Sequence, residues 1–397
     1  MIMQEFDVAV IGGGPIGGFV AKEIAGEEFK VAIFEEHENI GTPLKCAGLV
    51  TPRVFQFLDF PKKIAVQNEI KGANIHSPSG HILKIGGDKI HALVIDRQIF
   101  DKEIIKRSME KNAQIFLKNK ILSIKKNINN IELKTSQKKH VKCKMLIGAD
   151  GPNSKTREWF ELPPPSEFLK GIGAEIKNTN LNPDFVEIFT GRNIAPGFFA
   201  WMIPTKKDGS EARIGLCTSS DSTYPPKHYF MNFFKNQHSS PYLENVEITQ
   251  KIAGVIPLGV LKKTYAPNML LVGDAAAQVK PTSGGGIYTG LLCAKYCSSV
   301  AIEALNKNDF SISMLKNYHK KWSAGIGREL NLGMKLRSIF KKLNDRQLDK
   351  YIKRFQNPII IDTISKYGDI DYPSKLIKPL LERTPSLIKL LPKIIKK

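Results

Sequence analysis

The chain of 397 residues is long enough to bury a full hydrophobic core and too long for one minimal domain. Its 59 Lys and Arg exceed its 38 Asp and Glu, and the net charge of +21 indicates a polyanionic partner, either nucleic acid or an anionic membrane surface. Apolar runs stay shorter than about 18 residues, and no basic stretch precedes a long apolar core at the N-terminus, so we expect neither a spanning helix nor a signal peptide.

The five cysteines predict no metal site and no disulfide framework. They are scattered, odd in number and without a C-x-x-C pair, a pattern that fits the reducing cytosol. Cys293 and Cys297 are four residues apart on a predicted helix, and we interpret them as buried packing residues. The others are Cys46, Cys143 and Cys217.

The N-terminal segment predicts a strand, a glycine turn, a helix and a second strand. Residues 6–11 (FDVAVI) and 31–36 (VAIFEE) are apolar, as buried strands are, and helical spacing follows the turn GGGPIGG. A unit of this kind and length is typical of nucleotide-binding domains.

The glycine turn has the spacing of a dinucleotide site. Gly12, Gly14 and Gly17 form G-x-G-x-x-G, which lets backbone N–H groups at a helix N-terminus approach a pyrophosphate. Glu35 ends the second strand, 18 residues beyond Gly17, where an acid accepts hydrogen bonds from an adenosine ribose. The alternative interpretation is a tight turn beside a solvent-facing acid.

The remaining pattern predicts a mixed α/β fold whose domains are interleaved along the chain. Short hairpin-like segments fill residues 55–91, alternating segments over 161–265 indicate a largely antiparallel sheet, and the pattern after 305 is helical and basic. We expect a Rossmann-like dinucleotide domain, an antiparallel substrate domain and a helical C-terminal region. The dinucleotide domain comprises residues 1–160 and 266–305, with 55–91 as an excursion to the substrate side. The substrate domain comprises 161–265, and the helical C-terminal region comprises 306–397.

Two further segments each place an acid after a predicted strand. Asp150 follows MLIGA, and Asp274 follows NMLLVG and precedes a glycine run at residues 284–286. Asp274, at the end of its strand, can hydrogen-bond a ribityl hydroxyl of a flavin cofactor. The N–H groups of residues 284–287 can meet the pyrimidine edge of the flavin ring. Since NAD needs neither element, the pattern favours FAD.

These motifs, in this order, resemble a known family. G-x-G-x-x-G with Glu35, GADG and VGDAA resemble the FAD-binding domain of the para-hydroxybenzoate hydroxylase-like flavoproteins over residues 5 to about 305. KCAG, DRQIFD, FFAWMIP and PTSGGGI are similar to motifs of the geranylgeranyl reductases, especially the archaeal digeranylgeranylglycerophospholipid reductases. The resemblance implies an FAD enzyme that saturates isolated carbon–carbon double bonds of polyprenyl chains, including those of membrane lipids.

The resemblance also implies roles for individual residues. Cys46, Ala47 and Gly48 would lie beside the flavin, and Arg97 would reach the phosphate side of the cofactor, the alternative being an ordinary salt bridge with a neighbouring aspartate. The other implied contacts are Gly14, Ile16 and Gly17 at the pyrophosphate, Glu35 at the ribose, Ile121 at the adenine end, and Asp274, Gly286 and Ile287 at the ribityl and ring end. From their motifs, Gly12, Asp150, Gly284 and Gly285 are further predicted cofactor contacts.

An aromatic segment departs from the family pattern. Where the geranylgeranyl reductases have Tyr-x-Trp-x-Phe-Pro, this chain has Phe199, Trp201, Ile203 and Pro204, without the tyrosine hydroxyl. Alternate residues share one face of a strand, so Phe199, Trp201 and Ile203 could form one wall of a prenyl cavity; the alternative is a sandwich-core strand. The predicted substrate contacts are Phe199, Trp201 and Pro204, the last because it belongs to the family motif. The change brings the segment closer to the Trp-x-Trp-x-Ile-Pro pattern of flavin halogenases.

Cys46 is the candidate catalytic residue. Reduction of an isolated alkene needs a proton donor for the carbon that does not receive hydride, held within bonding reach in a dry cavity. The thiol of Cys46 either donates this proton, orients a water that does, or only contacts the ring.

Three rival functions share parts of the pattern. A flavin monooxygenase or halogenase would have the same FAD motifs. A dehydrogenase that passes electrons to a membrane quinone is disfavoured, because that group carries an iron–sulfur module near its C-terminus and no cysteine follows Cys297 here. The third rival is a non-catalytic basic protein that binds nucleic acid, a function that would account only for the positive net charge.

We predict a cytoplasmic reductase, peripherally associated with the membrane that holds its polyprenyl substrate, and no nucleic-acid partner. No second nucleotide fingerprint identifies the electron donor, which is left open between ferredoxin, NAD(P)H and a deazaflavin.

The C-terminal tail is the predicted membrane contact. Residues 375–397 carry seven basic side chains and one acidic one among Leu and Ile, which suits either a headgroup layer or a solvated tail packed on the body. If the tail is the anchor, its deletion should weaken co-sedimentation with anionic vesicles; undiminished binding would exclude that role.

Overall fold

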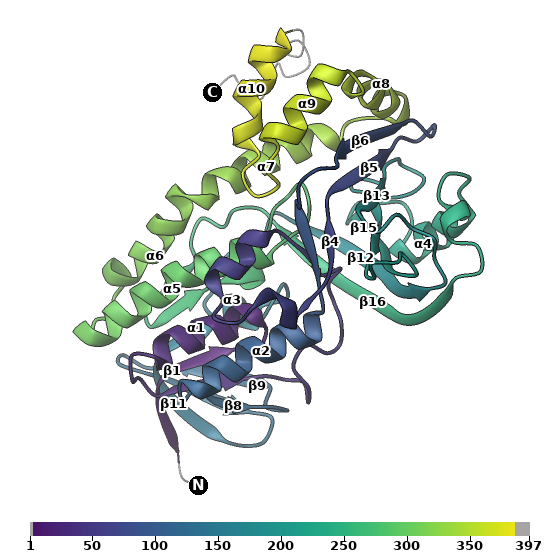
Figure 1. The fold of residues 1–397 in the computed structure, drawn as a ribbon. Helices are drawn as coiled ribbons and strands as arrows, with labels where there is room; N and C mark the ends of the chain where they lie inside the picture. Colours follow the sequence, from purple (N-terminus) through teal and green to yellow (C-terminus); the bar gives the residue numbers. More distant parts are fainter. Residues whose placement is uncertain (1–2, 386–397) are drawn as a thin grey trace.

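A computed structural model describes residues 3–385, and two large sheets flanked by helices make up its body (Figure 1). The last part of the predicted helical region, residues 386–397, lies outside the described residues. None of the helices within 3–385 is long and apolar enough to cross a membrane. The mixed α/β fold class that the sequence predicts is confirmed.

The first sheet is the Rossmann-like layer. Its main strands run in the order β17-β18-β11-β1-β2-β8, and β1 pairs in parallel with both β11 and β2. β9 and β10 extend it as an antiparallel excursion beside β11. The strands are β1 (Gln4–Ile11), β2 (Val31–Phe34), β8 (Gln114–Phe116), β9 (Ile121–Lys126), β10 (Ile131–Thr135), β11 (His140–Gly148), β17 (Tyr265–Ala266) and β18 (Met269–Leu271).

Three helices cover this sheet and bury its largest core: α1 (Pro15–Ala25), α2 (Arg97–Glu110) and α5 (Ile287–Lys307). Proline at the first position of α1 suits a helix start, since its missing N–H has no partner there. Asp96 caps α2 by accepting hydrogen bonds from the N–H groups of Gln98 and Ile99. Both helices therefore begin at the edge of the sheet where the candidate site lies.

The second sheet is largely antiparallel and has the order β16-β12-β15-β14-β13-β5-β6. β5 pairs with β13 in parallel. β5 and β6 come from the early excursion of the chain and join this sheet at its outer edge, so a long connection separates β5 from β13, as parallel pairing requires. The strands are β5 (Gly72–His76), β6 (Ile82–Gly86), β12 (Glu167–Lys177), β13 (Phe185–Phe189), β14 (Ala200–Pro204), β15 (Glu211–Ser219) and β16 (Glu247–Leu258).

Small elements link the two sheets. A three-stranded sheet of order β3-β7-β4 is formed by the segment from residue 49 to 95, which also supplies β5 and β6 of the second sheet, and α4 packs against β12 and β15. These elements are β3 (Leu49–Val50), β4 (Val66–Ile70), β7 (Ala92–Ile95), α3 (Lys155–Trp159), α4 (Pro226–Lys235), η1 (Pro52–Phe57), η2 (Lys62–Ile64), η3 (Ser240–Tyr242) and η4 (Gly273–Ala276).

The C-terminal helices lead from the first sheet to the far end of the second one. Figure 1 shows α8, α9 and α10 gathered beside β5 and β6, and α8 and α9 pack on β6. Arg337 on α7 anchors this region, because its buried guanidinium lies 2.7 and 2.9 Å from the carboxylate oxygens of Glu167 on β12. The helices are α6 (Ile312–Ala324), α7 (Ile326–Phe340), α8 (Asp345–Phe355), α9 (Pro358–Tyr367) and α10 (Ser374–Arg383).

Candidate functional site

One continuous cavity of about 1520 Å³ runs between the two sheets. The glycine turn, the end of β2 and the glycine run before α5 line one part of it, and the inner face of the antiparallel sheet lines the other. The turn that carries Cys46 also contributes to the wall. The cavity is therefore a single space with a polar cradle and an apolar chamber.

The three glycines of the first turn serve different purposes. Gly12 has a φ of +108°, and a Cβ there would overlap the carbonyl oxygen of Ala149. A Cβ on Gly17 would overlap the carbonyl oxygen of Gly12, so Gly17 lets α1 pack on the strand without lining the cavity. Gly14 precedes α1 and has nothing within 4 Å of an added Cβ, which leaves open space at the helix N-terminus. That space is where a pyrophosphate fits.

Glu35 lies beside this turn at the end of β2. Its carboxylate accepts hydrogen bonds from the backbone N–H of Gly13 (2.8 Å) and of His37 (2.9 Å). The His37 ring Nδ1 is 2.5 Å from Oε1 of Glu35, the same oxygen that accepts the hydrogen bond from the His37 backbone N–H. These bonds hold the carboxylate at the rim of the cavity, where the sequence expects a ribose.

Arg97 lines the cavity and also forms an ion pair. Its guanidinium binds both carboxylate oxygens of Asp101, at 3.0 and 2.7 Å, and it interacts with the thiol of Cys46. Burial lowers the pKa of Arg97, but Asp101 and then Cys46 raise it, so that it lies above its usual value. Arg97 therefore both forms a salt bridge and lines the cavity. Its salt-bridge partner is Asp101, whereas the neighbouring Asp96 caps α2.

The two predicted acids have different surroundings. The Asp150 carboxylate is held by its own loop, accepting hydrogen bonds from the Ser154 hydroxyl (2.6 Å) and from the N–H and hydroxyl of Thr156. No residue of the 3–385 range donates a hydrogen bond to the side chain of Asp274, and burial raises its pKa to about 6 while Arg97 opposes the rise. A hydroxyl of a bound ligand would supply the missing donor to Asp274.

The glycine run forms the adjoining wall. Gly284, Gly285, Gly286 and Ile287 all line the cavity, and Gly286 is the N-cap of α5 without a side-chain cap. The hydroxyl of Ser283 is buried and has no hydrogen-bond partner in the described residues. Buried polar groups normally have partners, so this wall is prepared for a polar ligand.

Arg213 of β15 fixes the turn that carries Cys46. The Arg213 guanidinium is 2% exposed and donates to the carbonyls of Ala47 (3.2 Å) and Ile95 (2.8 Å). Gly48 has a φ of +71°, and a Cβ there would overlap this guanidinium. Arg213 was not among the residues predicted from the sequence, although a single arginine within the apolar strand ARIGLC was a usable signal.

Phe199 and Trp201 lie in the apolar chamber, as their shared strand face predicts. Their ring centroids are 6.1 Å apart, and Ile203 continues the same wall. Pro204 is buried at the end of β14 and is not a lining residue. The indole N–H of Trp201 is buried without a partner among the described residues.

A second missed group joins the C-terminal region to the cradle. Lys280, which lines the cavity before the glycine run, lies 2.6 Å from the fully buried carboxylate of Asp371. Asp371 also accepts from the Thr51 hydroxyl (2.7 Å) and Arg53 (3.1 Å). Lys280 in the segment QVKPTS was a visible charge, whereas nothing in the sequence indicated its partner 91 residues away.

The structure thus brings most predicted residues to one cavity. Ile121 and Cys46 line it, and Gly17 and Pro204 lie behind its surface. The predicted lining residues that it brings together are Gly12, Gly14, Ile16, Glu35, Cys46, Ala47, Gly48, Arg97, Ile121, Asp150, Phe199, Trp201, Asp274, Gly284, Gly285, Gly286 and Ile287.

Comparison with known proteins gives one family and a consistent set of relatives. Residues 5–324 match the family described as FAD binding domain. An uncharacterized protein of Methanocaldococcus jannaschii is 35% identical over 95% of both chains. The digeranylgeranylglycerophospholipid reductase of the same organism is 30% identical over 97% of both chains, and the second such reductase of Methanopyrus kandleri is 28% identical over 97% of this chain and 98% of its own.

Solved structures show the same fold. A geranylgeranyl bacteriochlorophyll reductase-like protein from Thermoplasma acidophilum superimposes with a TM-score of 0.86 at 24% identity, covering 99% of this chain and 100% of its own. The flavin-dependent brominase Bmp2, as a triple mutant, gives 0.73 at 16% identity, covering 98% and 100%. At such identities the likeness concerns the fold alone.

The cofactor is FAD, and the residues present fit it. The open helix N-terminus at Gly14 suits the pyrophosphate, the undonated carboxylate of Asp274 suits a ribityl hydroxyl, and the orphaned hydroxyl of Ser283 suits a polar ring edge.

Gly14→Ala tests the cradle. The added methyl meets no protein atom within 4 Å, so the fold should keep its melting temperature while FAD affinity falls by about tenfold, roughly 1.4 kcal/mol, because the methyl occupies the space of the pyrophosphate. Titration of the apoprotein with FAD measures this. Gly26→Ala, at the other end of α1 with a φ of −62°, is the control and should bind FAD normally. Unchanged affinity in Gly14→Ala would refute this position for the pyrophosphate.

Proposed function

This chain belongs to the geranylgeranyl reductase family of flavoproteins with an FAD-binding domain, and from this premise we propose that it saturates isolated carbon–carbon double bonds in the geranylgeranyl chains of archaeal-type membrane ether lipids. The observation that carries the proposal is the single cavity in which the FAD cradle continues into an apolar chamber. The names of the relatives that are 28–30% identical support the same substrate class.

The reaction adds one hydride and one proton across each double bond. FAD bound in the cradle would supply the hydride when reduced, and its two electrons would be restored by two successive one-electron transfers from ferredoxin or by hydride from NAD(P)H or a deazaflavin. The chain itself must therefore bind the alkene, exclude water and deliver the proton.

The apolar chamber suits an extended isoprenoid. Its wall includes residues of three neighbouring strands of the second sheet: Ile75 on β5, Val186 and Ile188 on β13, and Trp201 and Ile203 on β14. A hydrocarbon buried against such a wall gains about 25 cal/mol for each Å² removed from water. The same wall keeps water from the reacting carbons.

Cys46 is the proton donor in this proposal. Its thiol lies at the junction of the cradle and the chamber, on the turn fixed by Arg213. Donation breaks the S–H bond, forms a C–H bond at the alkene and leaves a thiolate that water reprotonates. Arg97 lines the same cavity, and a positive charge near the sulfur would stabilise the thiolate that proton donation leaves.

Peripheral association with a membrane is part of the proposal. The net charge of +21 and the basic residues of α10, Lys375, Lys378 and Arg383, support it. Ile359 and Ile370 of the C-terminal part are about half exposed and would add apolar contact.

Anaerobic turnover tests the function. Protein whose flavin has been reduced with dithionite should reoxidise when unsaturated archaeal-type ether lipid is added, and the lipid should gain two mass units for each bond reduced. Fully saturated lipid is the control and should leave the flavin reduced. A flavin that stays reduced with every prenyl substrate, yet couples oxygen consumption to substrate modification, would instead identify a monooxygenase or halogenase.

Cys46→Ala tests the proton donor. The variant should bind FAD with an unchanged spectrum and lose about a hundredfold or more in single-turnover rate, the usual effect of removing a general acid. Cys217→Ala is the matched control: burial raises the pKa of the Cys217 thiol to about 12, although it too lines the cavity. A full rate in Cys46→Ala would exclude the thiol as the donor.

A further inference from the structure

The glycine run before α5 is joined to Lys280 in a closed loop. The backbone N–H of Lys280 donates to the carbonyl of Gly285 (3.1 Å), and the N–H of Gly284 donates to the carbonyl of Lys280 (2.8 Å). The Lys280 side chain lies beside Gly285, since a Cβ added there would be 3.0 Å from its Cε and 3.4 Å from its Nζ. The ammonium is therefore held at the glycine wall of the cavity, which Lys280 also lines.

The Lys280 ammonium has hydrogen-bond donors left over. Its side chain is 10% exposed, and the one acceptor that it has within residues 3–385 is Oδ1 of Asp371 at 2.6 Å, whereas an ammonium carries three N–H groups. The buried hydroxyl of Ser283, in the same loop, has no partner in that part of the chain either. Nearly buried donors without acceptors are costly, so this corner of the cavity suits a ligand that presents acceptor atoms.

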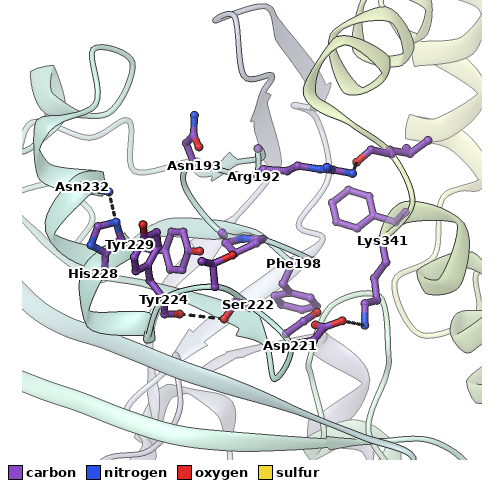
Figure 2. A pocket seen from close by; sticks show the side chains of 18 of the residues that line it. Arg192, Asn193, Phe198, Asp221, Ser222, Tyr224, His228, Tyr229, Asn232 and Lys341 are labelled. Atoms are coloured by element: carbon purple, nitrogen blue, oxygen red, sulfur yellow. Dashed lines mark hydrogen bonds and ion pairs between the residues drawn. The ribbon is translucent and has the colours of Figure 1, made fainter.

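A lysine in the neighbouring cavity is satisfied differently. Figure 2 shows Lys341 directed at Asp221 in a smaller cavity of about 530 Å³, whose lining does not include Lys280. The Lys341 ammonium lies 3.6 Å from Asp221 and 3.1 Å from Glu167, and its side chain is 30% exposed. Lys341 thus has two carboxylates and solvent within reach, whereas Lys280 has one carboxylate and little contact with solvent.

Asp371 holds the Lys280 ammonium on the side away from the cavity. Its carboxylate is fully buried and is not part of the lining. The second carboxylate oxygen accepts from the Thr51 hydroxyl (2.7 Å) and from Arg53 (3.1 Å), whose guanidinium also binds both oxygens of Asp369 at 2.8 Å. The pair of Lys280 and Asp371 is neutral as a whole, but its positive end lies at the cavity and its negative end lies behind the wall.

The loop that carries Asp371 is fastened to the start of α5. The hydroxyls of Tyr372 and Tyr288 are 2.7 Å apart, and Tyr288 belongs to the first turn of α5. The backbone N–H of Asp371 donates to Asp369 (3.0 Å), which shapes the loop itself. The ammonium and the N-terminus of α5 therefore keep a fixed separation, as a preorganised electrostatic site requires.

The charge of FAD changes at the ring edge that suits this wall. Reduction adds two electrons and one proton to the ring at neutral pH, so one extra negative charge develops on the pyrimidine side. A fixed positive group near this edge favours the reduced form. The N-terminus of α5, which has no side-chain cap, contributes a partial charge of the same sign.

We propose that Lys280 donates a hydrogen bond to the pyrimidine edge of bound FAD and raises the reduction potential of the cofactor, and that Asp371 positions the ammonium and limits this rise. The inference concerns the cofactor and holds for whichever substrate receives the hydride. A higher potential makes it easier for an external donor to reduce the FAD. The loop after α9 thereby helps to set this potential, although Asp371 is 91 residues from Lys280 in the chain.

Lys280→Met tests the charge at this edge. The variant removes the positive end of the pair, so the equilibrium should shift about tenfold toward oxidised FAD, a fall in midpoint potential of about 30 mV for a two-electron couple. Anaerobic equilibration of the FAD-loaded protein with a reference dye of known potential measures this. Lys375→Met is the control and should keep the wild-type potential, because Lys375 binds Asp369 of the same loop (3.1 Å) but lies outside the lining. An unchanged potential in Lys280→Met would overturn the proposal.

Asp371→Asn tests the opposite sign and decides the matter if Lys280→Met does not bind FAD. It removes the negative end of the pair and leaves the ammonium, so the potential should rise; an unchanged or lower potential would contradict the role of the pair. A purely structural role would not move the potentials of the two variants in opposite directions. No lipid is present in these measurements, so a protein that fails to reduce lipid can still show both shifts, and a protein that reduces lipid without them lacks the Lys280 contact.

Discussion

The buried guanidinium of Arg213 is the contact on which the geometry of the site depends. It comes from β15 in the antiparallel sheet, pairs with Glu175 at 2.8 Å, and binds the carbonyls of the Cys46 turn and of β7. Elements that are far apart in the chain are thereby fixed at the junction of cradle and chamber. A buried charge is stable only if its donors are all used, so these carbonyls cannot move independently.

A paired buried charge also fixes the opposite rim of the cavity. Lys280 stands before the glycine run, and its charge is neutralised by Asp371, which no water reaches and which Thr51 and Arg53 also bind. The loop after α9 is therefore part of the cavity wall rather than a peripheral extension, and Ile370 within it lines the space. Binding of a long substrate must be compatible with this fixed segment.

Local patterns were sufficient for the cradle. The glycine spacing, Glu35 after the second strand and Asp274 after β18 are neighbours in sequence of the elements that position them, so their place followed from the strand and helix pattern. The wall residues Phe199 and Trp201 followed from strand alternation in the same way. Pro204 did not, because its ring is buried at the end of the strand and away from the cavity.

What the sequence determined by itself was the nucleotide-binding architecture, because steric limits at glycine and the periods of helix and strand are local properties. The tertiary structure alone decided which partners the buried charges meet: Arg213 with the carbonyl of Ala47 in the Cys46 turn, and Lys280 with Asp371. Such pairings depend on how separate sheets pack and on which groups lose contact with water, and neither is encoded in the spacing of any one segment.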